Sequence, residues 1–73
     1  MYLSKGEYCQ FSLKGRLNLL YEFGTFINEK YIDETKIKIY ILNDFYVEVL
    51  YNNEKAIKAE PVLFAGMMHY YSC

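Results

Sequence analysis

The chain has 73 residues, of which 53% are hydrophobic and 23% charged, and its formal net charge is −1. A chain of this length forms one small domain, 1–73, and its apolar content is too high for a disordered segment. Its scattered lysines and arginines argue against a general nucleic-acid binder, and no apolar run reaches the roughly 18–20 residues of a membrane span.

The N-terminal stretch MYLSKGEYCQF contains no apolar core of the kind found in signal peptides. We therefore expect a cytoplasmic protein. In that reducing compartment Cys9 and Cys73 are expected to be free thiols, and a disulfide between them is the alternative.

Residues 1–11 show no periodicity and are expected to be irregular. Ser12 then stands where an N-cap residue is expected, and the leucines after it recur at helical spacing, which predicts a helix over 13–23. Gly24 is placed for a left-handed residue at the end of this helix. The leucines of the predicted apolar stripe are Leu13, Leu17 and Leu20.

The segment TFINEKYID, 25–33, has two interpretations: an edge strand, or a continuation of the helix. From Lys36 onward the hydrophobic period is two, in the runs KIKIYIL, FYVEVLY and KAIKAEP. Turn-prone residues separate these runs at 43–44 and 52–53. The pattern predicts an α+β fold, in which one N-terminal helix packs through its leucines on a three- to four-stranded antiparallel β-meander.

Glu48, in the middle of FYVEVLY, allows the pairing of the strands to be tested. A two-residue loop at Asn43–Asp44 places Glu48 opposite Ile39, whereas a three-residue loop over 42–44 places it opposite Lys38. An unpaired buried carboxylate costs several kcal/mol, and a cross-strand pair of opposite charges contributes about 0.2–1 kcal/mol. We therefore predict the three-residue loop.

This pairing gives the sheet one apolar face and one charged face. A second three-residue loop, over 52–54, sets Glu48 opposite Lys58, so that Glu48 lies between two lysines and is structural rather than catalytic. On this pairing, Glu48→Gln costs about 1 kcal/mol of stability or less. The predicted core face consists of Ile37, Ile39, Ile41, Phe45, Val47, Val49, Ile57 and Ala59.

The phrases SLKGRLNLLYEFGTF and KIYILNDFYVEVLYN together resemble a group of short uncharacterised bacterial proteins. These share a leucine-rich helix, a glycine and then antiparallel strands centred on a sequence similar to FYVEV. The resemblance covers roughly residues 10–60. It implies a bacterial single-domain protein with the helix-plus-meander fold and an edge strand over 25–31, and it brings no assigned activity and no functional residues.

No set of residues has the spacing of a catalytic or metal site. His69 and Cys73 lack an orienting partner and an oxyanion site, and Cys9 adds only a third soft ligand, whereas structural zinc sites use four. The glycines are isolated and form no phosphate-binding loop. We therefore predict a protein that is not an enzyme and that holds no cofactor or metal.

The chain has more large apolar side chains than one helix and one sheet face use, which predicts a small protein-interaction or regulatory module. We expect it to self-associate, as a homodimer or another homo-oligomer, or to bind a protein partner. The alternatives are a nucleic-acid-binding accessory protein using the aromatic face around Tyr40 and Tyr46 with Lys38 and Lys58, or a small-ligand binder. The apolar segment 62–73 either covers the sheet as a short C-terminal helix or forms a subunit contact. The predicted interface comprises Tyr40, Tyr46, Leu50, Tyr51, Phe64, Met67, Met68, Tyr70 and Tyr71.

Overall fold

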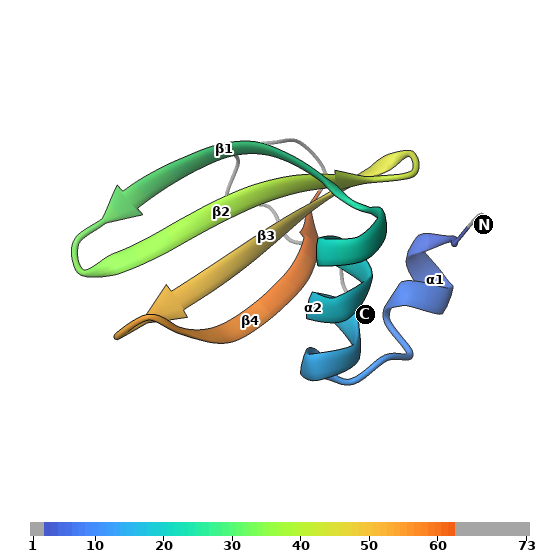
Figure 1. Cartoon of the computed structure of the whole chain (residues 1–73), viewed down its shortest axis with the longest axis horizontal. Coiled ribbons are helices and arrows are strands. Elements are labelled where there is room, and N and C mark those ends of the chain that lie inside the picture. The colour runs from blue at the N-terminus through green and yellow to red at the C-terminus, as the bar shows by residue number, and fades with distance from the viewer. Residues whose placement is uncertain (1–2, 63–73) are drawn as a thin grey trace.

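The computed structural model describes residues 3–62 of the chain. Two helices precede a four-stranded antiparallel sheet whose strands lie in sequence order (Figure 1). The elements are α1 (Lys5–Tyr8), α2 (Leu13–Phe23), β1 (Thr25–Ile32), β2 (Thr35–Leu42), β3 (Phe45–Asn52) and β4 (Lys55–Val62). The predicted α+β class and the helix over 13–23 are confirmed, and the ambiguous segment is a strand. The predicted C-terminal helix lies outside the described residues.

Helix α1 begins at a capping box that the sequence analysis missed. The Ser4 hydroxyl accepts a hydrogen bond from the Glu7 amide (3.2 Å), and the Glu7 carboxylate accepts one from the Ser4 amide (3.1 Å). This reciprocal pair satisfies two amides that the start of a helix leaves without partners. The expectation of irregular structure is therefore wrong for Lys5–Tyr8.

Helix α2 begins at the predicted N-cap, where the Ser12 hydroxyl accepts a hydrogen bond from the Gly15 amide (3.2 Å). Gly24 ends the helix for a different reason from the predicted one, because its φ of −81° is not left-handed. A Cβ at Gly24 would lie 2.7 Å from the carbonyl oxygen of Leu20. The glycine is needed because the chain turns into β1 against the last turn of the helix.

The three hairpins are all built in the same way. Each strand has eight residues, and each hairpin closes with two residues between the strands. The first residue of every turn has a positive φ, which Asn and Asp tolerate better than most residues. The turns are Asp33–Glu34, Asn43–Asp44 and Asn53–Glu54, and the positive φ values are those of Asp33, Asn43, Asn53 and Glu54.

The predicted three-residue loops are therefore wrong, and with them the predicted faces of the sheet. Glu48 lies opposite Ile39 on β2 and opposite Glu60 on β4, while Lys38 faces Val49 and Lys58 faces Leu50. The prediction assumed that one sheet face is exposed. Both faces bear apolar side chains, so alternation alone did not distinguish the two registers.

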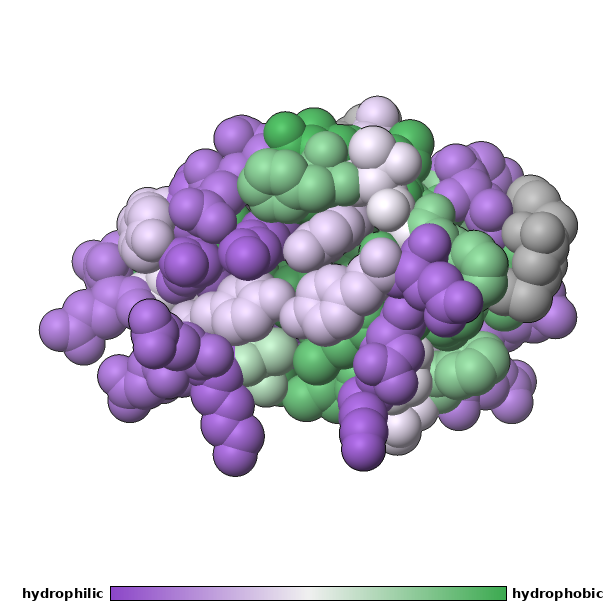
Figure 2. All heavy atoms as spheres, in the orientation of Figure 1, coloured by the Kyte–Doolittle hydropathy of each residue, from purple (hydrophilic) through white to green (hydrophobic). Residues whose placement is uncertain are grey.

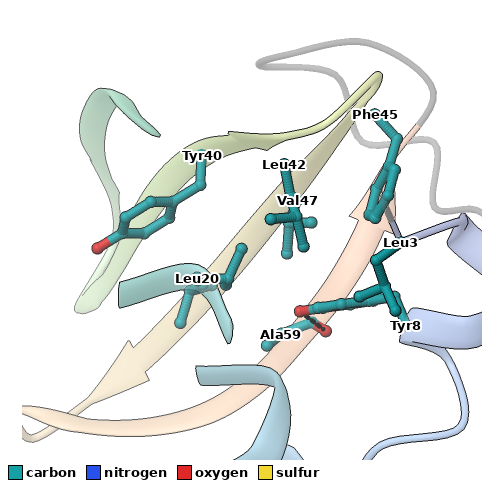
Figure 3. Packing of buried hydrophobic residues seen from close by; sticks show 9 residues of the cluster. Leu3, Tyr8, Leu20, Tyr40, Leu42, Phe45, Val47 and Ala59 are labelled. Carbon is teal, nitrogen blue, oxygen red and sulfur yellow. Dashed lines mark hydrogen bonds between the residues drawn. The ribbon is translucent and has the colours of Figure 1, made fainter. Parts of the chain in front are cut away.

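The helices cover one face of the sheet, which we call the helix face. Leu20 of α2 and Tyr8 of α1 are fully buried in one cluster with side chains of three strands (Figure 3). Leu13, Leu17 and Leu19 pack against this cluster. The strand residues of the cluster are Tyr40, Leu42, Phe45, Val47, Val49 and Ala59.

The other face, which we call the second face, is also buried at its centre. Ile37, Ile39, Glu48 and Val62 are each at most 2% exposed, and none of them belongs to the cluster under the helices. Ile57, which was predicted to lie in the core, falls at a register shift of β4 and is 48% exposed. The sheet is thus buried on both sides.

Candidate functional site

The structure divides the predicted interface residues between the two faces of the sheet. Tyr40 and Tyr51 lie on the helix face, where Tyr40 is buried, whereas Tyr46 and Leu50 lie on the second face. The aromatic platform predicted around Tyr40 and Tyr46 is therefore not formed. The remaining predicted interface residues, Phe64, Met67, Met68, Tyr70 and Tyr71, lie outside the described part of the chain.

Glu48 has the most unusual environment of any described charged residue. Its side chain is 0% exposed, and neither carboxylate oxygen has a hydrogen-bond partner within residues 3–62. Its cross-strand neighbours are Ile39 and Glu60, so no opposite charge faces it directly. Burying a carboxylate without a partner costs several kcal/mol, so Glu48 is expected to lower the stability of the folded protein.

Several tyrosines meet on the helix face beside the end of α2. The hydroxyls of Tyr21 and Tyr51 are 3.0 Å apart, and the Tyr40 ring makes edge contacts with Tyr21 and Phe26. Burial, together with the hydrogen bond that it shares with Tyr21, raises the pKa of Tyr51 well above its usual range, and burial also raises the pKa of Tyr40. Tyr40 and Tyr51 are therefore neutral at physiological pH.

Two lysines of β2 lie over tyrosine rings. The Lys38 ammonium is 5.2 Å from the centre of the Tyr51 ring, and the Lys36 ammonium is 5.8 Å from that of Tyr31. Figure 2 shows side chains of high and intermediate hydropathy in the middle of the viewed face, with strongly hydrophilic ones on both sides of them. The two cations are thus paired with aromatic faces of the protein itself.

A shallow hollow of about 290 Å³ lies at the tips of the first and third hairpins. Its lining mixes one cation with two acids. The lining residues are Tyr31, Glu34, Lys36, Tyr51, Asn53 and Glu54.

Arg16 of α2 joins the helices to strand β4 at Ala59 and Glu60. Its guanidinium donates hydrogen bonds to the carbonyl oxygens of Phe11 (3.0 Å), Cys9 (2.8 Å) and Ala59 (3.2 Å), and it lies 3.4 Å from the Glu60 carboxylate. The Tyr8 hydroxyl donates a second hydrogen bond to Ala59 (3.1 Å), which Figure 3 shows. Neither Arg16 nor Tyr8 was identified from the sequence, because no periodicity or motif around either residue predicts its contact with β4.

The opposite edge of the sheet, at β1, has no further strand beside it within residues 3–62. Strand β1 pairs only with β2 among the described strands, and seven of its eight residues are exposed. Glu29 shares the helix face with its neighbour Lys38, and Lys30 shares the second face with Ile37. The backbone groups of β1 that point away from β2 therefore have no described strand beside them.

Exposed apolar side chains concentrate along this open edge. Six of the eight large hydrophobic residues that are exposed within residues 3–62 lie on β1 or in the last three residues of α2. Half-exposed side chains of this size amount to an apolar area on the order of 500 Å². We call them the β1 patch: Tyr21, Phe23, Phe26, Ile27, Tyr31 and Ile32, which are 41–65% exposed.

Cys9 is joined in a disulfide, so the prediction of a free thiol at this position is wrong. The other cysteine of the sequence, Cys73, and the only histidine, His69, lie outside the described residues. Among residues 3–62, no group of three or more histidine, cysteine or acidic side chains is arranged to hold a metal ion. No helix in this part of the chain is long and apolar enough to cross a membrane.

Comparison of the chain with protein families, with curated proteins and with solved structures finds no match. The candidate site is therefore defined by geometry alone: an open edge strand with the β1 patch along it.

Proposed function

We propose that the protein is a non-enzymatic interaction module that binds an extended segment of a partner protein along β1. The observation that carries this proposal is the combination of an open, eight-residue edge strand with six exposed apolar side chains. An added strand gains main-chain hydrogen bonds along the edge, and side chains on alternate positions give it specificity.

The charges of β1 favour a different protein over a second copy of the chain. In an antiparallel two-fold pairing, each side chain meets a neighbour on the same sheet face. Glu29 and Lys30 lie on opposite faces, so a second copy does not pair them with each other. When the two-fold axis lies beside the middle of β1, either Glu29 is opposite Glu29 of the second copy or Lys30 is opposite its Lys30. Like charges that lie directly opposite each other are destabilising.

The same two charges define the partner segment that fits. A basic side chain opposite Glu29, followed at the adjacent position by an acidic one opposite Lys30, complements both faces of the strand. Apolar residues on either side of this pair cover Phe26 and Tyr31. Charges on an open edge also exclude unselective strand pairing, so they restrict the choice of partner.

Selection from a phage-displayed library of random twelve-residue peptides tests this proposal. We expect enriched peptides with adjacent basic and acidic residues flanked by apolar ones, and we expect the double variant Glu29→Lys/Lys30→Glu to select the reverse charge order. The control is Lys14→Glu/Glu22→Lys on the exposed side of α2, which conserves net charge equally and should select the same peptides as the unmodified protein.

Two results would overturn the proposal. One is the absence of any enriched sequence whose binding is reduced by Glu29→Lys/Lys30→Glu. The other is a solution mass that shows a dimer, dissociated by Ile27→Lys, because a second copy then occupies β1.

The nucleic-acid alternative has weaker support. The lysines beside the exposed tyrosines contact tyrosine rings, and Glu29, Glu34 and Glu54 lie around the same surface, where they repel phosphates. A salt-sensitive shift of a labelled single-stranded oligonucleotide, abolished by Lys36→Glu, would favour this alternative.

A further inference from the structure

The shallow hollow lies at the end of the sheet away from the helices. In Figure 1, α1 and α2 stand beside one end of the sheet, and the tips of the first and third hairpins lie at the other. Tyr31, Lys36 and Tyr51 are direct neighbours across β1, β2 and β3, so they form a row on the helix face at this end. Side chains of both hairpin tips complete the lining of the hollow.

Each of these two hairpin tips contributes one exposed carboxylate to the hollow. Glu34 comes from the turn between β1 and β2, and Glu54 comes from the turn between β3 and β4. Within residues 3–62, neither carboxylate makes a salt bridge. Among the described residues of the lining, Lys36 is the one cation, so the lining has a net negative charge. The hollow therefore attracts a positively charged group to the space between the two tips.

Glu54 stands at a backbone position for which glycine is better suited. Its φ of 64° is left-handed, and it follows Asn53, whose φ is 52°. Two-residue turns with positive φ at both positions favour Asn-Gly, because glycine adopts this conformation without strain. Each of the other two turns has one such residue. A glutamate here lowers stability, and strain of this kind concentrates at functional sites, so we expect the carboxylate itself to have a use.

The aromatic rings at the hollow already lie beside cations of the protein. The Lys36 ammonium is 5.8 Å from the centre of the Tyr31 ring, and the Lys38 ammonium is 5.2 Å from that of Tyr51. Tyr31 is 65% exposed, so its ring is accessible to a further group. Arginine makes such contacts more often than lysine, because its guanidinium is planar and weakly hydrated. The hollow thus combines aromatic faces with two carboxylates, which are the groups that a guanidinium contacts.

We propose that the hollow binds the guanidinium group of an arginine side chain of a partner protein. A guanidinium has five N–H donors in one plane, so it donates to Glu34 and Glu54 while it stacks on Tyr31. The volume of about 290 Å³ is at the lower limit of the roughly 300–1,000 Å³ of small-molecule sites, which favours one side chain over a larger ligand. This inference does not rest on the proposed function, because an arginine in a loop of any partner reaches a hollow at the end of the sheet.

Titration of the isotope-labelled protein with N-acetyl-L-arginine methylamide, followed by NMR, tests this proposal. We expect saturable amide shifts at Tyr31, Glu34 and Glu54 with a millimolar Kd, and we expect the corresponding lysine compound to bind about threefold more weakly. Glu54→Gly should weaken binding of the arginine compound by about threefold to fivefold while Tm rises, a combination that a purely structural role of Glu54 does not produce. Glu34→Gln should weaken binding by a similar factor.

The matched control is Asp33→Asn. Asp33 belongs to the same turn as Glu34 but does not line the hollow, and asparagine tolerates its φ of 56°, so the affinity should stay within about twofold. The proposal is overturned if no shift saturates, if the lysine compound binds as tightly as the arginine compound, or if both Glu54→Gly and Glu34→Gln leave the affinity unchanged. Because the probe forms no strand, failure of this site is distinguishable from failure of the partner segment proposed for β1.

Discussion

Replacement of Glu48 by leucine should stabilise the protein. Its carboxylate is 0% exposed, has no hydrogen-bond partner within residues 3–62 and faces Ile39 and Glu60 across the strands. Exchanging buried charges for apolar groups of similar volume is often neutral or stabilising by about 1–4 kcal/mol. We expect Glu48→Leu to raise the free energy of unfolding by about 2 kcal/mol. Glu48→Gln should give a smaller gain, because its amide also lacks partners.

Thermal and urea unfolding of the oxidised protein at pH 7, followed by far-ultraviolet circular dichroism, measure this effect. For a domain of this size, 1 kcal/mol corresponds to about 4–8 °C in Tm, so the expected rise for Glu48→Leu is roughly 10 °C. Glu29→Leu on the exposed strand β1 is the control and should change stability by less than about 0.5 kcal/mol. A loss of stability in both Glu48 variants would refute the reasoning, since it would mean that the carboxylate has a donor.

Three further predictions concern other parts of the fold. Arg16→Lys should lower the free energy of unfolding by about 2–3 kcal/mol in urea titrations, because one ammonium does not replace the three carbonyl contacts of the guanidinium, whereas Lys14→Ala on the exposed side of α2 should be nearly neutral. Glu54→Gly should raise Tm by a few degrees, because Glu54 has a φ of 64°, whereas Glu34→Gly, at a turn position without positive φ, should lower it. The raised pKa values of Tyr8 and Tyr51, caused chiefly by burial, favour the neutral phenols in the folded state, so stability should be unaffected below the unfolded pKa of about 10 and should fall as pH rises beyond it; in a pH titration, their phenolate absorbance should appear only with loss of the circular dichroism signal.

The helix and the strand pattern could be predicted because local signals carry them. Ser12 and the leucines after it define α2, and the alternation after Lys36 defines strands. The register could not be predicted from alternation, since both sheet faces are buried. The decisive signal was nevertheless in the sequence: a turn-prone pair recurs every ten residues, at 33–34, 43–44 and 53–54. Eight-residue strands with two-residue turns follow from that spacing.

The candidate site was only partly predictable. An edge strand over 25–31 was expected, but its exposure depends on where α2 lies, and α2 covers β4 and β2 more than β1. The prediction that the register avoids burying Glu48 is wrong. The fold accepts the cost of a buried carboxylate, because the register that buries it also pairs Leu42 with Phe45 and Tyr40 with Val47 under the helices.

The two edges of the sheet differ in a way that limits how the protein assembles. At β4, the Ala59 carbonyl oxygen accepts hydrogen bonds from Tyr8 and Arg16, so side chains of both helices contact this edge strand. At β1, no described element does so. A sheet with two open edges adds strands on both sides and grows into fibres, whereas one with a single open edge accepts one strand and stops. The contacts of Arg16 therefore stabilise the core and favour β1 over β4 for the strand addition that we propose, in which Glu29 and Lys30 would select the partner.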